Sequence, residues 1–312
     1  MSVTSPLNKE KTLQLYNESG GKGLLELAAA EREKTSKNGV GLCAIVNAKS
    51  GKCSEDCVFC AQSAHYKTDI ADSPPLNAEE VLSYAVMLER KGVKRLSLVT
   101  SGRGISDRDL DTLLSVYRVL RENTGLSLCA SHGIITPEQA KRLKAGGVTR
   151  YHHNLETGES YFPNICTTHT YREKLKTIAV VQDAGLEICS GGLVGLGESI
   201  EDRIELAFAL QGLNVKSIPV NILMPVSGTP LEHTEIISAP DLLKNAALFR
   251  CINPEARIRF AAGRPLYDIQ TQMKSLKYGF DGVMVGDYLT RKGLEIESDI
   301  GNIIAGGFSI MK

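Results

Sequence analysis

The chain has 312 residues with 36 basic and 36 acidic side chains, so its formal charge at pH 7 is zero. Such a balance gives no basic surface for nucleic acid or an anionic membrane, and no apolar run approaches the length of a membrane span. The first residues show no secretory signal, so we expect a cytoplasmic protein. Its eight cysteines are then expected to be ligands or reduced thiols, not disulfides.

Short β-branched runs alternate with amphipathic helical patterns along most of the chain. We expect strands at 42–47, 95–100, 126–130, 150–154, 186–190, 217–223, 256–261 and 282–285. Helices are expected between them at 77–92, 106 onward, 136–146, 171–184, 199–210, 240–251 and 269–278. Ser106, Thr136 and Ser199 each precede an acidic or amide residue by three positions, which is typical of a capping box.

Eight strand–helix repeats over about 250 residues predict a closed (β/α)8 barrel. A doubly wound open sheet would place a glycine-rich phosphate loop after the first strand, and residues 47–51 do not form one. We expect an N-terminal helical extension over 1–37, the barrel over 38–290 and a C-terminal tail over 291–312. Functional residues of such barrels collect at the C-terminal ends of the strands.

Three cysteines, Cys53, Cys57 and Cys60, follow the first strand at C-x3-C-x2-C spacing. Three thiolates on one loop can hold three corners of a cubane iron–sulfur cluster, whereas clusters fixed wholly by protein usually take four cysteines. The fourth iron then stays open to a small molecule. This loop resembles that of the S-adenosylmethionine (SAM) radical enzymes, which implies a [4Fe-4S] cluster, SAM, and Phe59 packed against the adenine.

Zinc is the alternative occupant of this loop. Structural zinc takes four ligands, usually as two separated pairs, and the chain has no second C-x2-C pair. His65 could supply a fourth ligand, so zinc stays open as an alternative. The position of Phe59, between the second and third cysteines, favours the radical cluster.

Nearly the whole chain, from the cysteine loop to Arg264, resembles the biotin synthase family. The similar segments are 53–63, 151–157, 167–171, 189–198 and 221–230. The resemblance implies conversion of dethiobiotin to biotin by insertion of one sulfur between two unactivated carbons. No side-chain base can break such C–H bonds, so radical chemistry of a cofactor is expected in place of a catalytic side chain. The resemblance further implies that two SAM molecules are cleaved per biotin and that a second, deeper cluster supplies the sulfur.

The same resemblance implies three cysteines and one arginine as ligands of that second cluster. Cys129, Cys189 and Arg259 match three of these positions, and the fourth holds Ser97. A serine alkoxide is a harder and poorer ligand for iron than a thiolate. The auxiliary cluster is therefore expected as [2Fe-2S] or as an altered form.

We expect different roles for the remaining cysteines. Cys43 lies on the first strand, beside the strand that carries Ser97, and either replaces the missing thiolate or is a core cysteine. Cys166 and Cys251 are expected to be small buried hydrophobes. The alternative explanation for Arg259 is a salt bridge, because an unpaired buried cation is costly.

The resemblance also implies contacts with SAM and substrate. The cofactor set is Asn154, Glu156, Lys174, Gly191, Gly192, Gly195 and Gly197, and the substrate set is His152, Asn154 and Asn221. A carboxylate suits the ribose diol, and carboxamides suit the ureido ring of dethiobiotin. Lys174 stands where the family has an arginine for the SAM carboxylate. The glycines have turn geometry as their alternative explanation.

Two other functions stay open at this point. A radical SAM enzyme without sulfur insertion, resembling the hydrogenase-maturation or methylornithine synthase branch, is favoured by Ser97 and His152. The three retained auxiliary positions argue against it. A non-enzymatic iron–sulfur protein would leave Glu156 and Asn221 without a purpose. The family resemblance further implies an electron donor such as flavodoxin or ferredoxin, and a homodimer.

Overall fold

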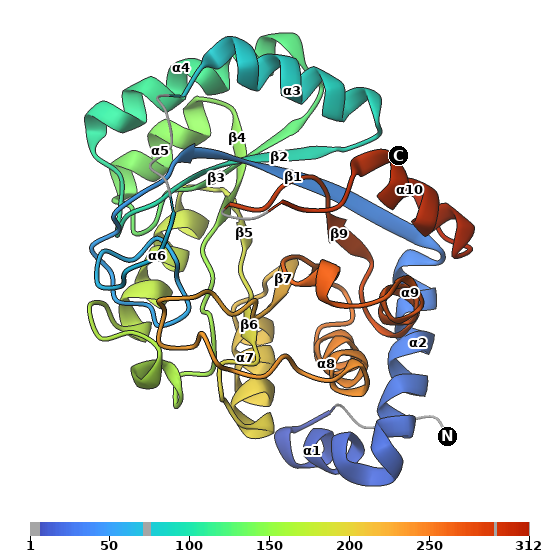
Figure 1. The fold of residues 1–312 in the computed structure, drawn as a ribbon. Coiled ribbons are helices and arrows are strands. Elements are labelled where there is room, and N and C mark those ends of the chain that lie inside the picture. Colours follow the sequence, from blue (N-terminus) through green and yellow to red (C-terminus); the bar gives the residue numbers. More distant parts are fainter. Residues whose placement is uncertain (1–6, 71–75, 290–291, 312) are drawn as a thin grey trace.

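The computed structural model describes residues 7–70, 76–289 and 292–311 (Figure 1). Its strands are β1 (Gly39–Lys49), β2 (Arg95–Thr100), β3 (Ser127–Ser131), β4 (Val148–His152), β5 (Glu187–Cys189), β6 (Gly192–Val194), β7 (Ser217–Ile222), β8 (Arg257–Phe260), β9 (Gly282–Met284) and β10 (Ser309–Ile310). Its α-helices are α1 (Lys9–Asn17), α2 (Lys22–Ser36), α3 (Ala78–Arg90), α4 (Asp107–Asn123), α5 (Pro137–Ala145), α6 (Tyr171–Asp183), α7 (Ile200–Gly212), α8 (Ala239–Ile252), α9 (Ile269–Tyr278) and α10 (Ile296–Ala305). Short 3-10 turns are η1 (Glu18–Gly21), η2 (Phe162–Asn164) and η3 (Arg264–Leu266).

The strands close into a parallel barrel. Neighbours follow the order β1-β2-β3-β4-β5-β7-β8-β9, and β9 pairs back with β1. The short strand β6 pairs with β7, and β10 pairs with the start of β1. Helices α3 to α9 lie around the outside of this barrel, and α1 and α2 lie beside α7, α8 and α9 (Figure 1). The prediction of a (β/α)8 barrel with an N-terminal helical extension is confirmed.

Helix starts follow the predicted signals closely. Side chains of Asn77, Ser106, Thr136 and Ser199 each accept a backbone N–H in the first turn, and the last two complete a capping box. The differences lie elsewhere. Strand β4 lies two residues earlier than expected, and β6 was not predicted because three residues carry too little pattern. The segment expected as a tail contains α10 and β10.

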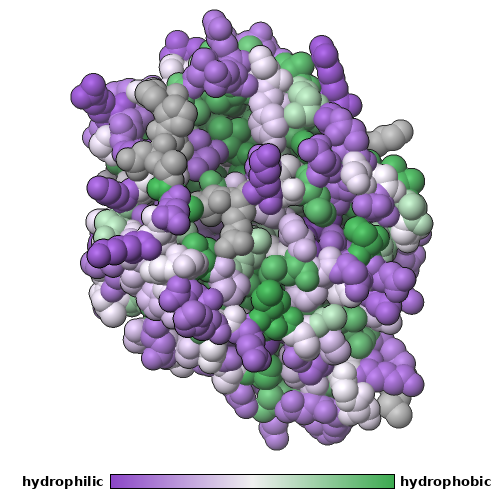
Figure 2. Space-filling model, viewed as in Figure 1, coloured by the Kyte–Doolittle hydropathy of each residue, from purple (hydrophilic) through white to green (hydrophobic). Residues whose placement is uncertain are grey.

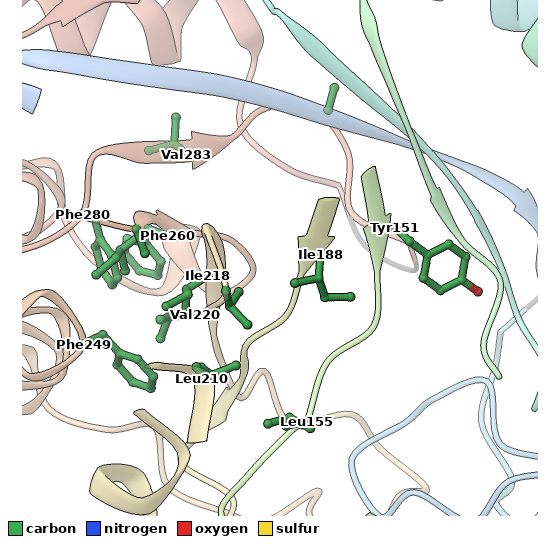
Figure 3. Close-up of a cluster of buried hydrophobic side chains, with 14 of the residues drawn as sticks. Tyr151, Leu155, Ile188, Leu210, Ile218, Val220, Phe249, Phe260, Phe280 and Val283 are labelled. Carbon is green, nitrogen blue, oxygen red and sulfur yellow. The ribbon is translucent and has the colours of Figure 1, made fainter. Parts of the chain in front are cut away.

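Successive side chains on each barrel strand face opposite sides. On β8, Phe260 packs against Phe280 with the ring centroids 4.9 Å apart, whereas its neighbour Arg259 lines the interior cavity. On β5, Ile188 belongs to the hydrophobic core and Cys189 to the cavity. Figure 3 shows Ile188 and Phe260 within this core of buried side chains. Burial of the outer set therefore fixes which residues face inward.

Asp281, just before β9, ties the N-terminal extension to the barrel. Its carboxylate accepts hydrogen bonds from the Ser36 hydroxyl of α2 and from the backbone N–H of Ile258 at 2.8 Å. It also pairs with Arg250 at 3.0 Å and with Arg257 at 3.2 Å. The side chains of Arg250 and Asp281 are almost fully buried, so each needs the other as a partner.

Hydrophilic residues cover most of the face seen in Figure 2, with smaller hydrophobic patches between them. None of the helices in the described part of the chain is long and apolar enough to cross a bilayer. Each of the eight cysteines is a free thiol.

Replacing Asp281 by alanine is expected to lower the free energy of unfolding by about 3–5 kcal/mol, because Arg250 would be left buried and unpaired. The matched control is Asp109→Ala, which removes the exposed pair with Lys49 and should cost about 0–1 kcal/mol. Urea unfolding followed by circular dichroism measures both. Equal losses in the two variants would contradict this account.

Candidate functional site

A cavity of about 420 Å³ lies inside the barrel. It brings together most of the residues predicted from the sequence, namely Cys43, Phe59, Cys60, Ser97, Cys129, His152, Asn154, Glu156, Cys189, Asn221 and Arg259. The predicted residues outside its lining are Cys53, Cys57, Lys174, Gly191, Gly192, Gly195 and Gly197. Residues from the cysteine loop and from most barrel strands therefore face one space.

Five residues within the strands form a group that we call the deep belt: Cys43, Ser97, Cys129, Cys189 and Arg259. The register places Ser97 of β2 directly beside Cys129 of β3. Cys43 lies on β1, between β2 and β9, and its thiol lies 3.8 Å from the carbonyl oxygen of Val283. The deep belt lies within the barrel strands, whereas the cysteine loop follows the end of β1.

Arg259 is buried in this belt without a carboxylate. Its Nη1 donates to the Ser217 hydroxyl at 3.0 Å, and that hydroxyl donates to the Cys189 sulfur at 3.3 Å. Within the described residues it forms no ion pair, so the salt-bridge explanation fails. Arg259 Nε and Ser97 Oγ are buried polar atoms without a hydrogen-bond partner. Such atoms fit a polar or anionic group in the cavity.

Two further arginines at the cavity were not singled out from the sequence. Nη1 of Arg95 lies 3.5 Å from the Cys129 sulfur. Arg150 lines the cavity and pairs with the exposed carboxylate of Glu187 at 2.7 Å. A lone arginine on a strand gives no local signal of function, because only the register places it beside a thiol.

The charges around Cys189 favour its thiolate. Burial opposes ionisation, but the hydrogen bond and charge of His152, together with Arg259 and Arg150, lower the pKa of Cys189 to about 6. Burial likewise works against protonated His152, yet its contact with Cys189 raises the pKa of that imidazole. Burial raises the pKa of Cys129, although Arg95 and Arg150 oppose this. Thiols facing several guanidinium groups are a donor set that fits an anionic iron–sulfur group.

Above the belt, the segment after β4 presents polar groups. Glu156 has a left-handed φ of 74°, and its side chain accepts from the Asn154 amide at 3.2 Å. Nζ of Lys174 is buried, donates to the Asn154 carbonyl at 3.1 Å and lies 3.9 Å from the Glu156 carboxylate. Lys174 therefore lies behind Glu156, where it orients that side chain.

The four glycines serve packing and turns in this structure. A Cβ at Gly191 would lie 1.9 Å from the Pro219 carbonyl oxygen, and one at Gly192 would lie 2.2 Å from that of Glu156. Gly195 and Gly197 have φ angles of 97° and 96°, which other residues rarely adopt. Their role toward adenosine stays a prediction.

Asn221 of β7 lines the cavity, but backbone groups already engage its amide. Its NH2 donates to the Gly192 carbonyl at 3.2 Å, and its oxygen accepts from the Ala262 N–H at 3.0 Å. The side chain is therefore held in one orientation at the cavity wall.

Backbone hydrogen bonds fold the cysteine loop into a compact turn. The N–H of Cys53 donates to the Gln62 carbonyl, and that of Ala64 to the Cys53 carbonyl, both at 2.7 Å. The N–H of Cys60 donates to the Cys57 carbonyl at 2.9 Å. His65 Nε2 lies 3.0 Å from the Ser54 carbonyl oxygen. In the described chain, the loop thiols and His65 do not gather around one point as a zinc site requires.

A second segment, residues 166–169, holds this loop, and we call it the clasp. The Asp56 carboxylate accepts from the backbone N–H of Thr167 at 2.9 Å and of Thr168 at 3.1 Å. Burial works against that carboxylate, but the hydrogen bond from the Thr167 hydroxyl, together with these backbone bonds, holds its pKa well below its usual range. Glu55 lies 2.5 Å from His169 Nδ1 and accepts from the Thr168 hydroxyl at 2.9 Å. More than 100 residues separate loop and clasp, so no local pattern could predict this contact.

Cys166 of the clasp is buried, as expected, but it is not a plain hydrophobe. Its sulfur lies 3.2 Å from Asp56 Oδ1 and 3.2 Å from His169 Nδ1. Its hydrogen bond with Cys57 comes first among the contacts that lower the pKa of Cys166 to about 4, and the same contact raises that of Cys57. Cys251 matches its expectation, since it is buried in the hydrophobic core.

Two family models match the chain. Residues 48–210 match the radical SAM superfamily, and residues 219–309 match the biotin and thiamin synthesis associated domain. The chain is 47% identical over 307 residues to the biotin synthase of Clostridium botulinum (strain Loch Maree, type A3), covering 97% of this chain and 95% of that protein. It is 50% identical over 274 residues to the biotin synthase of Pelotomaculum thermopropionicum, covering 88% and 85%.

Solved structures share the fold at low identity. Methylornithine synthase superposes with a TM-score of 0.86 at 18% identity, covering 99% of this chain and 95% of that one. The [FeFe]-hydrogenase maturase HydG from Carboxydothermus hydrogenoformans superposes with a TM-score of 0.84 at 17% identity, covering 98% and 76%. At such identities the likeness shows the fold alone.

Replacing Asp56 by alanine is expected to loosen the cysteine loop from the clasp and to speed cluster loss to an iron chelator about tenfold or more. Asp69→Ala, an exposed aspartate close by in the sequence, is the control and should leave the rate unchanged. Visible absorbance of the reconstituted protein measures the decay. Equal rates in the Asp56 variant and wild type would show that the clasp does not support the cluster.

Proposed function

Because the chain belongs to the biotin synthase family of the radical SAM superfamily, we propose that it converts dethiobiotin to biotin by radical insertion of sulfur. The observation that supports this most is the single cavity in which Phe59 and Cys60 of the cysteine loop face the same space as the deep belt. The superfamily implies a [4Fe-4S] cluster and SAM, and the family implies dethiobiotin as substrate.

In this proposal Cys53, Cys57 and Cys60 hold the [4Fe-4S] cluster. Three thiolates on one loop can hold three irons of such a cluster and leave the fourth iron open to SAM. When bound, the cluster supplies an electron to SAM, whose cleavage gives the radical that removes hydrogen from the substrate. The chain's own task is to place and orient SAM, with Phe59 against the adenine and Glu156 toward the ribose diol.

Lys174 has a positioning role that the sequence did not indicate. Its ammonium lies between the Asn154 carbonyl and the Glu156 carboxylate, and it lies outside the cavity lining. It is expected to fix Glu156 and to add positive charge behind the SAM carboxylate. The backbone after β5, with Gly191, Gly192, Gly195 and Gly197, completes the cofactor side.

The deep belt is proposed to hold the auxiliary cluster through Cys129, Cys189 and Arg259. Ser97 and Cys43 are the candidates for the remaining ligand, and both line the cavity. The cluster is [2Fe-2S] or an altered form completed by sulfide. His152, Asn154 and Asn221 lie at the same cavity and are proposed to contact the ureido ring of dethiobiotin.

The alternatives find less support. The solved relatives with other activities share only the fold, at 17–18% identity, whereas biotin synthases match at 47–50% over most of the chain. A non-enzymatic iron–sulfur protein would leave the polar cavity wall above the belt unexplained. Sulfur insertion uses all of these groups together.

The division into domains, the location in the cell and the partners are also proposals. We treat residues 1–37, 38–290 and 291–312 as extension, barrel and tail, and we propose a cytoplasmic location, consistent with eight free thiols. A flavodoxin or ferredoxin is the proposed electron donor. A homodimer is also proposed, and light scattering that gave the mass of one chain, 33.8 kDa, would contradict it.

An anaerobic assay with dethiobiotin, SAM and a reductant should yield both 5′-deoxyadenosine and biotin. Cys57→Ala should abolish both products while circular dichroism stays unchanged, because the cubane needs all three thiolates. Cys251→Ala, outside the cavity, is the control and should retain activity. Formation of 5′-deoxyadenosine without biotin would favour an enzyme that lacks sulfur insertion.

The auxiliary site predicts iron beyond the first cluster. One cubane accounts for about four irons per chain. The wild-type protein should hold more iron than this, and the double variant Cys129→Ala/Cys189→Ala should hold only the iron of one cubane. Mössbauer spectra of anaerobic protein resolve the two populations. About four irons in both proteins would refute the second cluster. A Cys43→Ala change that alters only the second spectrum would identify Cys43 as its ligand.

A further inference from the structure

Four side chains behind the cavity wall form a buried polar group that the proposed reaction does not use. Tyr117 of α4, His132 just after β3 and Tyr151 of β4 are each 0% exposed, and Thr100 ends β2. None of the four lines the cavity. Hydrogen bonds connect them, and we call them the wall network. Buried polar groups are hydrogen-bonded in nearly all native structures, so these contacts define where each hydrogen lies.

The hydrogen bonds of the wall network run in one direction. The Tyr117 hydroxyl donates its single hydrogen to the carbonyl oxygen of Cys129 at 3.0 Å. In its contact with His132 Nε2 at 3.1 Å, the imidazole is therefore the donor. Nδ1 is left to accept from the Thr100 hydroxyl at 3.1 Å. Burial lowers the pKa of His132 to about 3, so the ring stays neutral and keeps this tautomer.

Tyr151 holds the same imidazole through the backbone. Its hydroxyl accepts the backbone N–H of His132 at 3.0 Å and donates to the Gly133 carbonyl at 2.8 Å. Neither bond involves Cys129. The wall network therefore has two ends: Tyr151 holds the turn after β3, and Tyr117 holds the peptide of Cys129.

The end at Cys129 lies where the strand pairing is irregular. The register of β3 with β4 shifts at this residue, which pairs with Arg150 and leaves Thr149 as the extra residue of a β-bulge. A bulge disrupts the ladder locally and redirects side chains. The sheet therefore holds this peptide less firmly than a regular ladder would, and the bond from Tyr117 gives it a fixed point.

The thiol of Cys129 points the other way, into the deep belt. It lines the cavity, and Nη1 of Arg95 lies 3.5 Å from its sulfur. Because the direction of the Cα–Cβ bond follows the backbone, any rotation of the Cys129 peptide moves that thiol. The outer bond to the carbonyl and the inner position of the sulfur are thus coupled through one residue.

We propose that Tyr117, held by His132, is a positioning residue of the sulfur-donating site: through the Cys129 carbonyl it fixes the direction in which this thiol enters the deep belt. The proposal rests on the proposed role of Cys129 as a ligand of the auxiliary cluster. Loss of a group that orients a metal ligand typically costs about 10–100-fold in metal affinity. The wall network makes no hydrogen bond to the cysteine loop, so SAM cleavage does not depend on it.

Tyr117→Phe keeps the ring and removes only the hydroxyl. In anaerobically reconstituted protein, the variant should lose the auxiliary cluster to an iron chelator about 10–100-fold faster than wild type. Mössbauer spectra assign the loss to the second cluster. The rate of 5′-deoxyadenosine formation should stay as in wild type, so that less biotin forms per 5′-deoxyadenosine.

Tyr151→Phe is the matched control, since it removes an equally buried hydroxyl with two hydrogen bonds from the same network. It should keep the wild-type chelation rate and product ratio. Equal acceleration in both variants would make the wall network a structural support only. An unchanged rate in Tyr117→Phe, or an equal fall of both products, would also overturn the positioning role.

A second readout needs no cluster. In the cluster-free, full-length chain, iodoacetamide should alkylate Cys129 faster relative to Cys189 in Tyr117→Phe, but not in Tyr151→Phe, as peptide mass spectrometry measures. An unchanged ratio in Tyr117→Phe would refute the positioning of Cys129. Only about four irons in wild type would instead refute the auxiliary cluster of the proposed function, so the two failures are distinguishable.

Discussion

The buried guanidinium of Arg259 is the constraint on which the account of the cavity depends. A cation inside a barrel is costly unless anionic groups surround it, and among the described residues no carboxylate pairs with it. The groups whose charge acts on it are the thiols of Cys43, Cys189 and Cys129 and, without an ion-pair contact, the carboxylate of Asp281. Its positive charge in turn helps to hold the pKa of Cys189 near 6. Arg259, the neighbouring thiols and the unpartnered Arg259 Nε together fit the anionic cluster that we propose between them.

The rest of the fold places the cysteine loop above the deep belt. The parallel strands alternate core residues with cavity residues, so packing of Ile188 and Phe260 outward turns Cys189 and Arg259 inward. The cysteine loop at the end of β1 is held by the clasp, which comes from the chain after β4. One cavity is thereby lined both by Phe59 and Cys60 of the cysteine loop and by the deep belt.

Much of this arrangement was predictable from the sequence. The barrel was predicted from the strand periodicity and from capping residues such as Thr136. The residues of the deep belt were predicted from the resemblance of the motifs. What could not be predicted depends on register and on contacts distant in sequence. The approach of Arg95 to Cys129 follows from the pairing of β2 with β3, and the polar role of Cys166 follows from Asp56, 110 residues away. Lys174 was assigned from its motif, but its burial behind Glu156 needed the structure.

The central claim is that the deep belt supplies the sulfur atom, and an isotope measurement tests it most directly. Protein reconstituted with ³⁴S-sulfide, then freed of excess sulfide, would be given dethiobiotin, SAM and reductant, and the biotin would be analysed by mass spectrometry. The account predicts ³⁴S in the first biotin formed, and loss of biotin in the Cys129→Ala/Cys189→Ala variant while 5′-deoxyadenosine still forms. Biotin that contained only unlabelled sulfur would contradict it.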